Sequence, residues 1–143
     1  MIGQNQRIEE VLREQGMYAS TTVGVSMYPM LRDRRDTVVI SPCRGRLEKY
    51  DVPLYRRGDA YVLHRVIGVK PEGYIIRGDN CLKKEDVKEE QIVGVLTTFF
   101  RGDKEINMKG FPYRAYARCW CFLFPLRIGC NLLRGLMKRI RRR

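Results

Sequence analysis

The chain has 143 residues, which is enough for one domain of ordinary size and leaves little room for a second. Hydrophobic residues make up 44% and charged residues 31%, so a collagen-like or largely disordered chain is excluded. The formal net charge is +12, but residues 111–143 hold nine of the 28 Lys and Arg residues and no acid. Because the remainder is nearly balanced in charge, we do not expect nucleic acid to be the partner.

Cysteine and histidine give no pattern that predicts a metal site. The five cysteines form no CxxC pair, and the chain has one histidine. Residues 1–15 are polar and charged, unlike a signal peptide, and no apolar run reaches the roughly 18 residues of a membrane span. We therefore expect reduced thiols in a cytosolic setting, with no metal and no organic cofactor.

The predicted elements begin with a helix over residues 5–15, where apolar side chains recur between charged ones and Gly16 follows. From residue 20 on, β-branched and aromatic runs alternate with Gly, Pro and Asp, which is typical of short strands joined by tight turns. The predicted strands span residues 21–25, 37–41, 52–56, 60–69, 73–77 and 92–100. We expect a mainly β fold, a small closed or half-closed barrel with a short N-terminal helix.

The tripeptide Arg-Gly-Asp occurs three times, at residues 57–59, 77–79 and 101–103. An adhesion motif is one interpretation. Gly-Asp between two strands is also what turn chemistry requires, and we favour that explanation.

The C-terminal tail, residues 111–143, has a different pattern, and Pro125 divides it. In its second half apolar side chains cover about half of a helical wheel. They are Ile128, Leu132, Leu133, Leu136, Met137 and Ile140, and the other side carries Arg127, Arg134, Lys138 and Arg141. A basic amphipathic helix preceded by aromatic residues is typical of a helix that lies in a membrane interface.

We therefore divide the chain into a body, residues 1–110, and the tail. The tail is expected to hold the protein at an anionic membrane surface, peripherally and at the cytoplasmic face. Integral insertion, packing of the helix on the body and contact with nucleic acid are the alternatives. A chain that ends at Lys109 is expected to stay soluble and to keep its activity.

Ser26 lies in Gly-Val-Ser-Met-Tyr-Pro, residues 24–29, at the end of a predicted strand. The chain must turn sharply there, because Pro29 fixes φ and biases Tyr28 toward an extended conformation. Gly24 leaves room for another backbone to approach, as a substrate strand would need. A serine in this position is most often a simple turn residue, so the segment alone predicts little.

The single histidine, His64, lies in the predicted strand 60–69 among apolar neighbours. A histidine in such a place is more often a core residue than a catalyst. Carboxylates follow after a turn, at Asp79, Glu85 and Asp86. A serine, a histidine and a carboxylate in this order could provide a nucleophile, a base and a residue that orients the base.

Taken together, Gly-x-Ser-Met-x-Pro, His-Arg-Val-Ile-Gly-Val and Arg-Gly-Asp-Asn resemble the type I signal peptidases and the wider S24/S26 serine peptidase superfamily. The resemblance covers residues 23–95, about half of the chain, with the motifs in the family's order. Many members use a lysine base, whereas His64 here is similar to the histidine branch of endoplasmic-reticulum and archaeal enzymes. The resemblance implies the β-rich fold shared by signal peptidases and LexA-like repressors, and cleavage after small residues.

The resemblance also implies residue roles: Ser26 as nucleophile, His64 as base, and Asp79 with Asp86 or Glu85 as the assisting acids. Gly24 stands where the family often has a hydroxyl group for the oxyanion, so backbone N–H groups such as that of Ser26 would form the oxyanion hole. Gly24, Met27 and Pro29 are expected to line the substrate groove.

We predict from this a serine endopeptidase that cleaves a peptide or the leader segment of a preprotein. A carboxylate beside His64 is expected to raise the pKa of its imidazole above the usual value of about 6.5. Two alternatives remain open: a repressor-type protease that cuts itself, and a catalytically idle module that binds peptides in the same groove.

Overall fold

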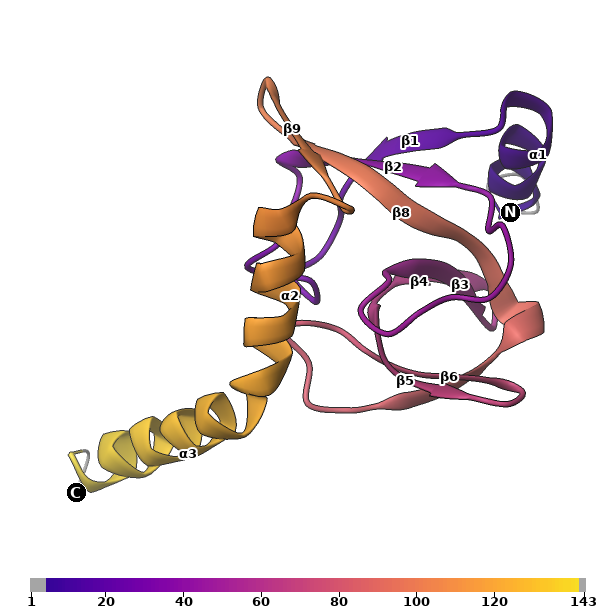
Figure 1. Ribbon diagram of the computed structural model, residues 1–143. Helices are drawn as coiled ribbons and strands as arrows, with labels where there is room; N and C mark the ends of the chain where they lie inside the picture. The colour runs from indigo at the N-terminus through magenta and orange to yellow at the C-terminus, as the bar shows by residue number, and fades with distance from the viewer. Residues whose placement is uncertain (1–4, 142–143) are drawn as a thin grey trace.

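The structure, a computed structural model, describes the backbone of residues 5–141 and the side chains of residues 8–141. Strands predominate in this range, with a helix before them and helices after them (Figure 1). The helices are α1 (Asn5–Gln15), α2 (Phe111–Phe122) and α3 (Phe124–Ile140). The strands are β1 (Tyr18–Thr21), β2 (Asp36–Ser41), β3 (Pro53–Arg57), β4 (Ala60–Leu63), β5 (Arg65–Lys70), β6 (Gly73–Arg77), β7 (Glu85–Lys88), β8 (Ile92–Arg101) and β9 (Lys104–Asn107).

The larger sheet has the strand order β1-β2-β8-β3-β4, and β9 pairs with β8 as a hairpin. β8 is its central strand, ten residues long and antiparallel to both β2 and β3. Gly94 lets β8 cross β2 closely, because a Cβ there would lie 2.6 Å from Ile40 Cγ2.

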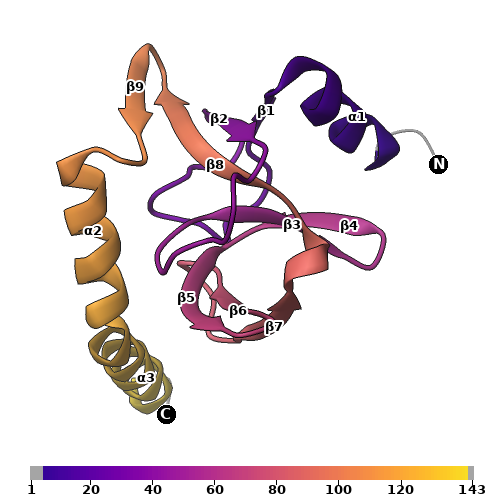
Figure 2. The same cartoon turned by 45° about the vertical axis from the view of Figure 1, so that its right-hand side comes forward.

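The smaller sheet has the order β5-β6-β7. The chain passes from one sheet to the other at His64, the single residue between β4 and β5. Together the strands curl into a half-barrel, with α1 at one end and α2 along one side (Figure 2). The predicted mainly β, half-closed architecture with an N-terminal helix is therefore confirmed.

The predicted strand over residues 21–25 is wrong, because β1 precedes it and ends at Thr21. The bonding to β2 ends at Thr22, whose backbone N–H donates to the Asp36 carbonyl at 2.9 Å, while its Oγ1 donates to the Arg32 carbonyl of the following loop at 2.7 Å. Gly24 then adopts a left-handed φ of +97°, which a strand does not contain.

Two further strands were not predicted. β7 has the sequence EDVK and β9 the sequence KEIN, and neither has enough apolar residues to show alternation. The predicted strand over residues 60–69 is present but divided at His64 into β4 and β5. The division places the histidine at a corner between two sheets.

The core has two clusters, one under each sheet. The larger contains buried residues of α1, the loop after Ser26, β2, β3 and β8, together with Tyr113 and Ala117 of α2. The smaller lies between β3 and the second sheet and is formed by Leu47, Tyr55, Val66, Tyr74, Ile76 and Val87.

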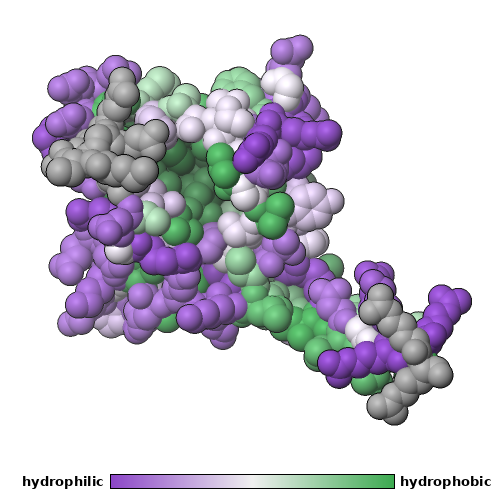
Figure 3. All heavy atoms as spheres, turned by 180° about the vertical axis from the view of Figure 1, so that it is seen from behind, coloured by the Kyte–Doolittle hydropathy of each residue, from purple (hydrophilic) through white to green (hydrophobic). Residues whose placement is uncertain are grey.

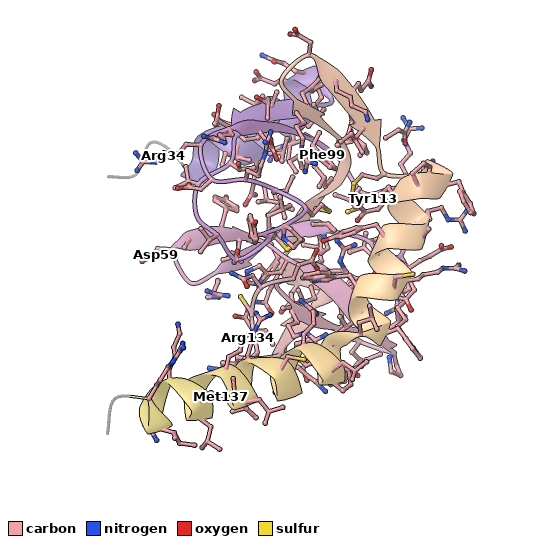
Figure 4. All side chains as sticks on the ribbon, turned by 90° about the vertical axis from the view of Figure 1, so that its left-hand side faces the viewer. Arg34, Asp59, Phe99, Tyr113, Arg134 and Met137 are labelled. Atoms are coloured by element: carbon pink, nitrogen blue, oxygen red, sulfur yellow. The ribbon has the colours of Figure 1, made fainter. Side chains whose placement is uncertain are left out.

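The two helices of the tail differ. α2 packs on the body, with Tyr113 8% and Ala117 1% exposed, whereas α3 has no buried residue. Figure 4 shows Tyr113 on α2 beside the body, while Arg134 and Met137 lie on α3, which extends beyond it. By packing, α2 thus belongs with the body, although the sequence pattern changes at residue 111. Within residues 5–141, no helix is both long and apolar enough to cross a membrane.

This packing changes the expected effect of truncation. A chain that ends at Lys109 loses the buried Tyr113 and Ala117, so we expect its free energy of unfolding in urea to fall by about 3–5 kcal/mol. A chain that ends at Leu123 keeps both residues and serves as the matched control, with an expected loss of at most about 1 kcal/mol. Equal stability of the two truncated chains would contradict the assignment of α2 to the core.

Candidate active site

Ser26 lies in a loop that is hydrogen-bonded to a second loop, the one that contains Asn80. The backbone N–H of Asn80 donates to the Ser26 carbonyl at 2.8 Å, and the Asn80 side-chain amide donates to the Val25 carbonyl at 3.2 Å. Both of these bonds use the carbonyl groups of residues 25 and 26. The backbone N–H of Ser26 has no hydrogen-bond partner among the described residues.

Gly78 allows these loops to approach His64. A Cβ on Gly78 would lie 2.7 Å from the Ser26 carbonyl oxygen and 3.1 Å from Cδ2 of the histidine ring. Real side chains do not tolerate such distances to a backbone atom, so only glycine fits. The glycine of the Arg-Gly-Asp-Asn segment therefore brings the serine loop and the histidine into one place.

His64 is 6% exposed, and side chains of β3 and β7 hold it through successive hydrogen bonds. Its Nδ1 lies 3.2 Å from the hydroxyl oxygen of Tyr55, and that hydroxyl donates to Glu85 Oε2 at 2.5 Å. Arg57 pairs with the same carboxylate. The imidazole is thus connected to a carboxylate through a tyrosine, and not directly.

This chain of contacts fixes the tautomer of the imidazole. Tyr55 has one hydroxyl proton and points it at Glu85, so the tyrosine oxygen must accept a hydrogen bond from His64 Nδ1–H. The neutral imidazole therefore carries its proton on Nδ1 and a lone pair on Nε2. That is the form in which Nε2 can act as a general base.

The surrounding groups keep His64 neutral and Glu85 charged. Burial lowers the pKa of His64 below the usual 6.5, and the negative charge of Glu85, which opposes this, is countered by Arg57. Our expectation of an upward shift is therefore wrong, because desolvation exceeds the effect of the carboxylate. Burial acts to raise the pKa of Glu85, but the hydrogen bond from Tyr55 and the charge of Arg57 lower it below its usual range. Burial and the bond to Glu85 raise the pKa of Tyr55, which keeps its proton.

Ser26 and His64 line the same cavity, of about 540 Å³, between β1 and β4. Most of its lining is apolar, and Figure 3 shows a hollow lined by apolar residues on the body. Within the residues that the structure describes, Ser26 and His64 share no hydrogen bond. Catalytic hydrogen bonds are often long without substrate and shorten when it binds, so this geometry is compatible with a serine–histidine pair.

The three predicted groove residues have different positions. Gly24 lies in the cavity wall, and Met27 lines it while also being 4% exposed in the core. Pro29 instead lines a second cavity, beside α2 and β9, to which Ser26 does not contribute. The structure therefore brings Gly24 and Met27 to the serine, but not Pro29.

Asp79 does not meet His64; it binds Arg65. Two parallel bonds join the buried pair, from Arg65 Nε to Asp79 Oδ1 at 2.7 Å and from Nη2 to Oδ2 at 2.8 Å. Tyr116 of α2 donates to the same carboxylate at 3.2 Å. The Asp79 carboxylate therefore accepts its hydrogen bonds from Arg65 and Tyr116, and these bonds hold the loop that follows β6 in place.

Asp86 is not bonded to His64 either. Its carboxylate pairs with Lys70 at 2.5 Å, and its side chain is 62% exposed. Both side chains of this pair lie at the surface. Of the carboxylates that the sequence offered, only Glu85 is connected to the histidine.

Tyr55 was missed in the sequence. Its spacing from His64 carries no motif, and the residue opposite it on β4 is Val62, not the histidine. The contact exists because the chain turns at His64 into the second sheet, a feature that strand alternation does not show.

Within residues 5–141, no three His, Cys, Asp or Glu side chains come together as a metal site. Comparison of the sequence with protein-family models and with curated proteins found no match.

The two aspartates are expected to differ in their effect on stability. Asp79→Asn leaves the charge of a fully buried arginine without its ionic partner, so we expect the free energy of unfolding to fall by about 3–5 kcal/mol. Asp86→Asn removes an exposed pair and is expected to cost at most about 1 kcal/mol. Urea unfolding of both variants measures the difference. Similar small losses would mean that the Asp79 pair does not hold the loops.

Proposed function

We propose that this protein is a serine endopeptidase that resembles the type I signal peptidases, with Ser26 as nucleophile and His64 as general base. The observation that carries the proposal is the Tyr55–Glu85 arrangement, which fixes the imidazole tautomer needed for a base. The base lies in an apolar cavity that Ser26 shares. The resemblance of the motifs around Ser26, His64 and Asn80 supports the same conclusion.

The proposed reaction begins when His64 Nε2 takes the proton of Ser26 Oγ, which then bonds to the carbonyl carbon of the substrate. The backbone N–H of Ser26, unpaired within the described chain, would donate to the oxyanion. His64 then protonates the leaving amine as the peptide C–N bond breaks. Water, activated by His64, hydrolyses the acyl-enzyme.

In this scheme Tyr55 and Glu85 are positioning residues. Tyr55 accepts a hydrogen bond from Nδ1–H, and the ionised Glu85 stabilises the imidazolium through the tyrosine hydroxyl. Asp79 has a structural role through Arg65. These roles differ from those implied by the resemblance, which assign an aspartate directly to the histidine.

One observation favours a second candidate, a module that binds extended peptides without cleaving them. Ser26 Oγ makes no hydrogen bond to His64 within the described chain. A binding module needs the groove, but it has no need for a fixed imidazole tautomer, so we prefer the peptidase.

A serine-reactive activity probe separates the two candidates. We expect the full-length protein to be labelled, Ser26→Ala and His64→Ala to fall to background, and the double variant to be no worse than either, because the two residues act as one unit. Ser20→Ala removes another serine of the same cavity and is the matched control, with normal labelling. Labelling that is absent from the wild type, or equal in Ser26→Ala, would favour the binding module.

The pH dependence of labelling follows from the lowered pKa of His64. A histidine base acts only when it is neutral. The labelling rate should therefore rise with pH, with the midpoint of the rise below pH 6.5, and be constant at higher pH. Glu85→Gln removes a charge that raises this pKa, so its limb should lie at still lower pH, with the plateau rate reduced about 10- to 100-fold. Asp86→Asn serves as the control with an unchanged profile. A limb above 7.5, about one unit over the usual histidine value, would exclude His64 in this environment.

The tail supports a proposed peripheral association with an anionic membrane surface. The apolar face of α3 is open to solvent, with Leu132 69%, Leu136 58% and Ile140 69% exposed. A stretch of apolar residues continues along the tail outside the body (Figure 3). Insertion of this face, together with attraction of the basic residues to anionic headgroups, would give reversible binding.

Two leucines with the same exposure test this association. Leu132 on α3 and Leu82 on the body are both 69% exposed. Leu132→Gln should weaken sedimentation with phosphatidylglycerol-containing vesicles about tenfold, because it removes apolar burial in the bilayer, whereas Leu82→Gln should have little effect. Equal behaviour of the two variants would contradict insertion of α3.

A further inference from the structure

Arg77, at the end of β6, is a buried cation that has no polar partner among the described residues. The residue is 7% exposed, and no hydrogen bond or ion pair of its side chain occurs within the described chain. Its guanidinium carbon lies 3.3 Å from the ring centroid of Phe124, the first residue of α3. The side chain is therefore held by an aromatic face, while its N–H groups have no acceptor within the described chain and reach solvent.

Arg127, one turn into α3, contacts the same ring. Its guanidinium carbon lies 5.5 Å from the Phe124 centroid and 3.6 Å from that of Trp120. Nη1 donates to the Asp79 carbonyl at 3.2 Å and Nη2 to the Trp120 carbonyl at 3.4 Å. Nε is buried and has no partner in the described structure. Both arginines thus lie at the junction of α2 and α3.

The charge at this junction is not balanced. The carboxylate whose charge acts on both arginines is that of Asp79, and Arg65 already binds it with two hydrogen bonds. The first turn of α3 contains no acid, so the positive end of the helix adds to the same field. Burial lowers the pKa of both Arg77 and Arg127, and for Arg77 the charge of Arg127 acts in the same direction. A bound anion would reduce the repulsion between the two guanidinium groups. It would also accept hydrogen bonds from the N–H groups that have no protein acceptor.

We propose that Arg77 and Arg127 form a binding site for a phosphate group at the junction of α2 and α3. Planar guanidinium groups bind phosphate oxygens with paired N–H donors, which a flexible lysine does not reproduce. The phosphate can come from a phospholipid headgroup or from solution, since both present the same oxygens. The site is independent of peptide cleavage, because it includes neither Ser26 nor His64.

Trp120 provides the measurement, because it is the only tryptophan of the chain and stacks directly on Arg127. Its fluorescence is titrated in separate experiments with inorganic phosphate and with vesicles of phosphatidylglycerol and phosphatidylcholine. Chloride at equal ionic strength and vesicles of pure phosphatidylcholine are the blanks. A response to phosphate identifies a soluble ligand, and a response to the anionic vesicles alone identifies a headgroup.

The variants decide whether the response belongs to this site. Arg77→Gln and Arg127→Gln should each weaken it at least tenfold, whereas Arg134→Gln, which removes an equal charge from an exposed position of α3, should change it less than about twofold. Arg77→Lys keeps the charge and should still lose most of the affinity for inorganic phosphate. Thermal unfolding shows whether Arg77→Gln folds. If it does not, Arg127→Gln, whose side chain lies on the surface helix, decides alone.

Two results would overturn the proposal: no saturable response to either probe, or equal losses in Arg134→Gln and Arg127→Gln, which would indicate diffuse attraction to the tail. The titration gives the same answer in a Ser26→Ala background. A failed peptidase assay and a failed phosphate titration are therefore separate outcomes.

Discussion

The buried ion pair between Arg65 and Asp79 holds together the segments on which the rest of the molecule depends. Arg65 is 0% exposed, and besides Asp79 it donates to the carbonyl of Tyr50 at 3.1 Å and to the hydroxyl of Tyr113 at 2.5 Å. These partners come from a connecting loop and from α2, while Asp79 belongs to the loop that holds Ser26. Since a buried charge without its partner is strongly unfavourable, all these segments must take their places together.

This arrangement separates the two carboxylates that the sequence could not distinguish. Asp79 is used to fix backbone segments, and Glu85 is left to act on His64 through Tyr55. The proposed catalytic base is therefore oriented by a neutral hydroxyl with an ionised carboxylate behind it. Such an arrangement lowers the cost of burying the imidazole, because only a neutral ring faces the apolar cavity before substrate arrives.

Much of the fold could be predicted, because hydrophobic alternation marks β2, β3, β6 and β8, and Gly16 marks the end of α1. The division of the predicted strand 60–69 at His64 could not be predicted, since its two halves pair in two different sheets. The segments around Ser26, His64 and Asn80, which the motifs singled out, lie side by side, and this follows from Gly78. The motifs did not predict a role for Tyr55, because that role follows only from its tertiary contact with His64. The tail pattern predicted the helix of α3, but not that α2 completes the core.

The proposed mechanism depends on the state of one imidazole, and the chain has only one histidine. Nitrogen-15 NMR of histidine-labelled protein therefore reports the tautomer and the pKa of His64 without an assignment problem. We expect a neutral ring protonated on Nδ1, with a pKa below 6.5 that falls further in Glu85→Gln. A ring protonated on Nε2, or a pKa above 6.5 that does not respond to the loss of Glu85, would contradict the proposed mechanism.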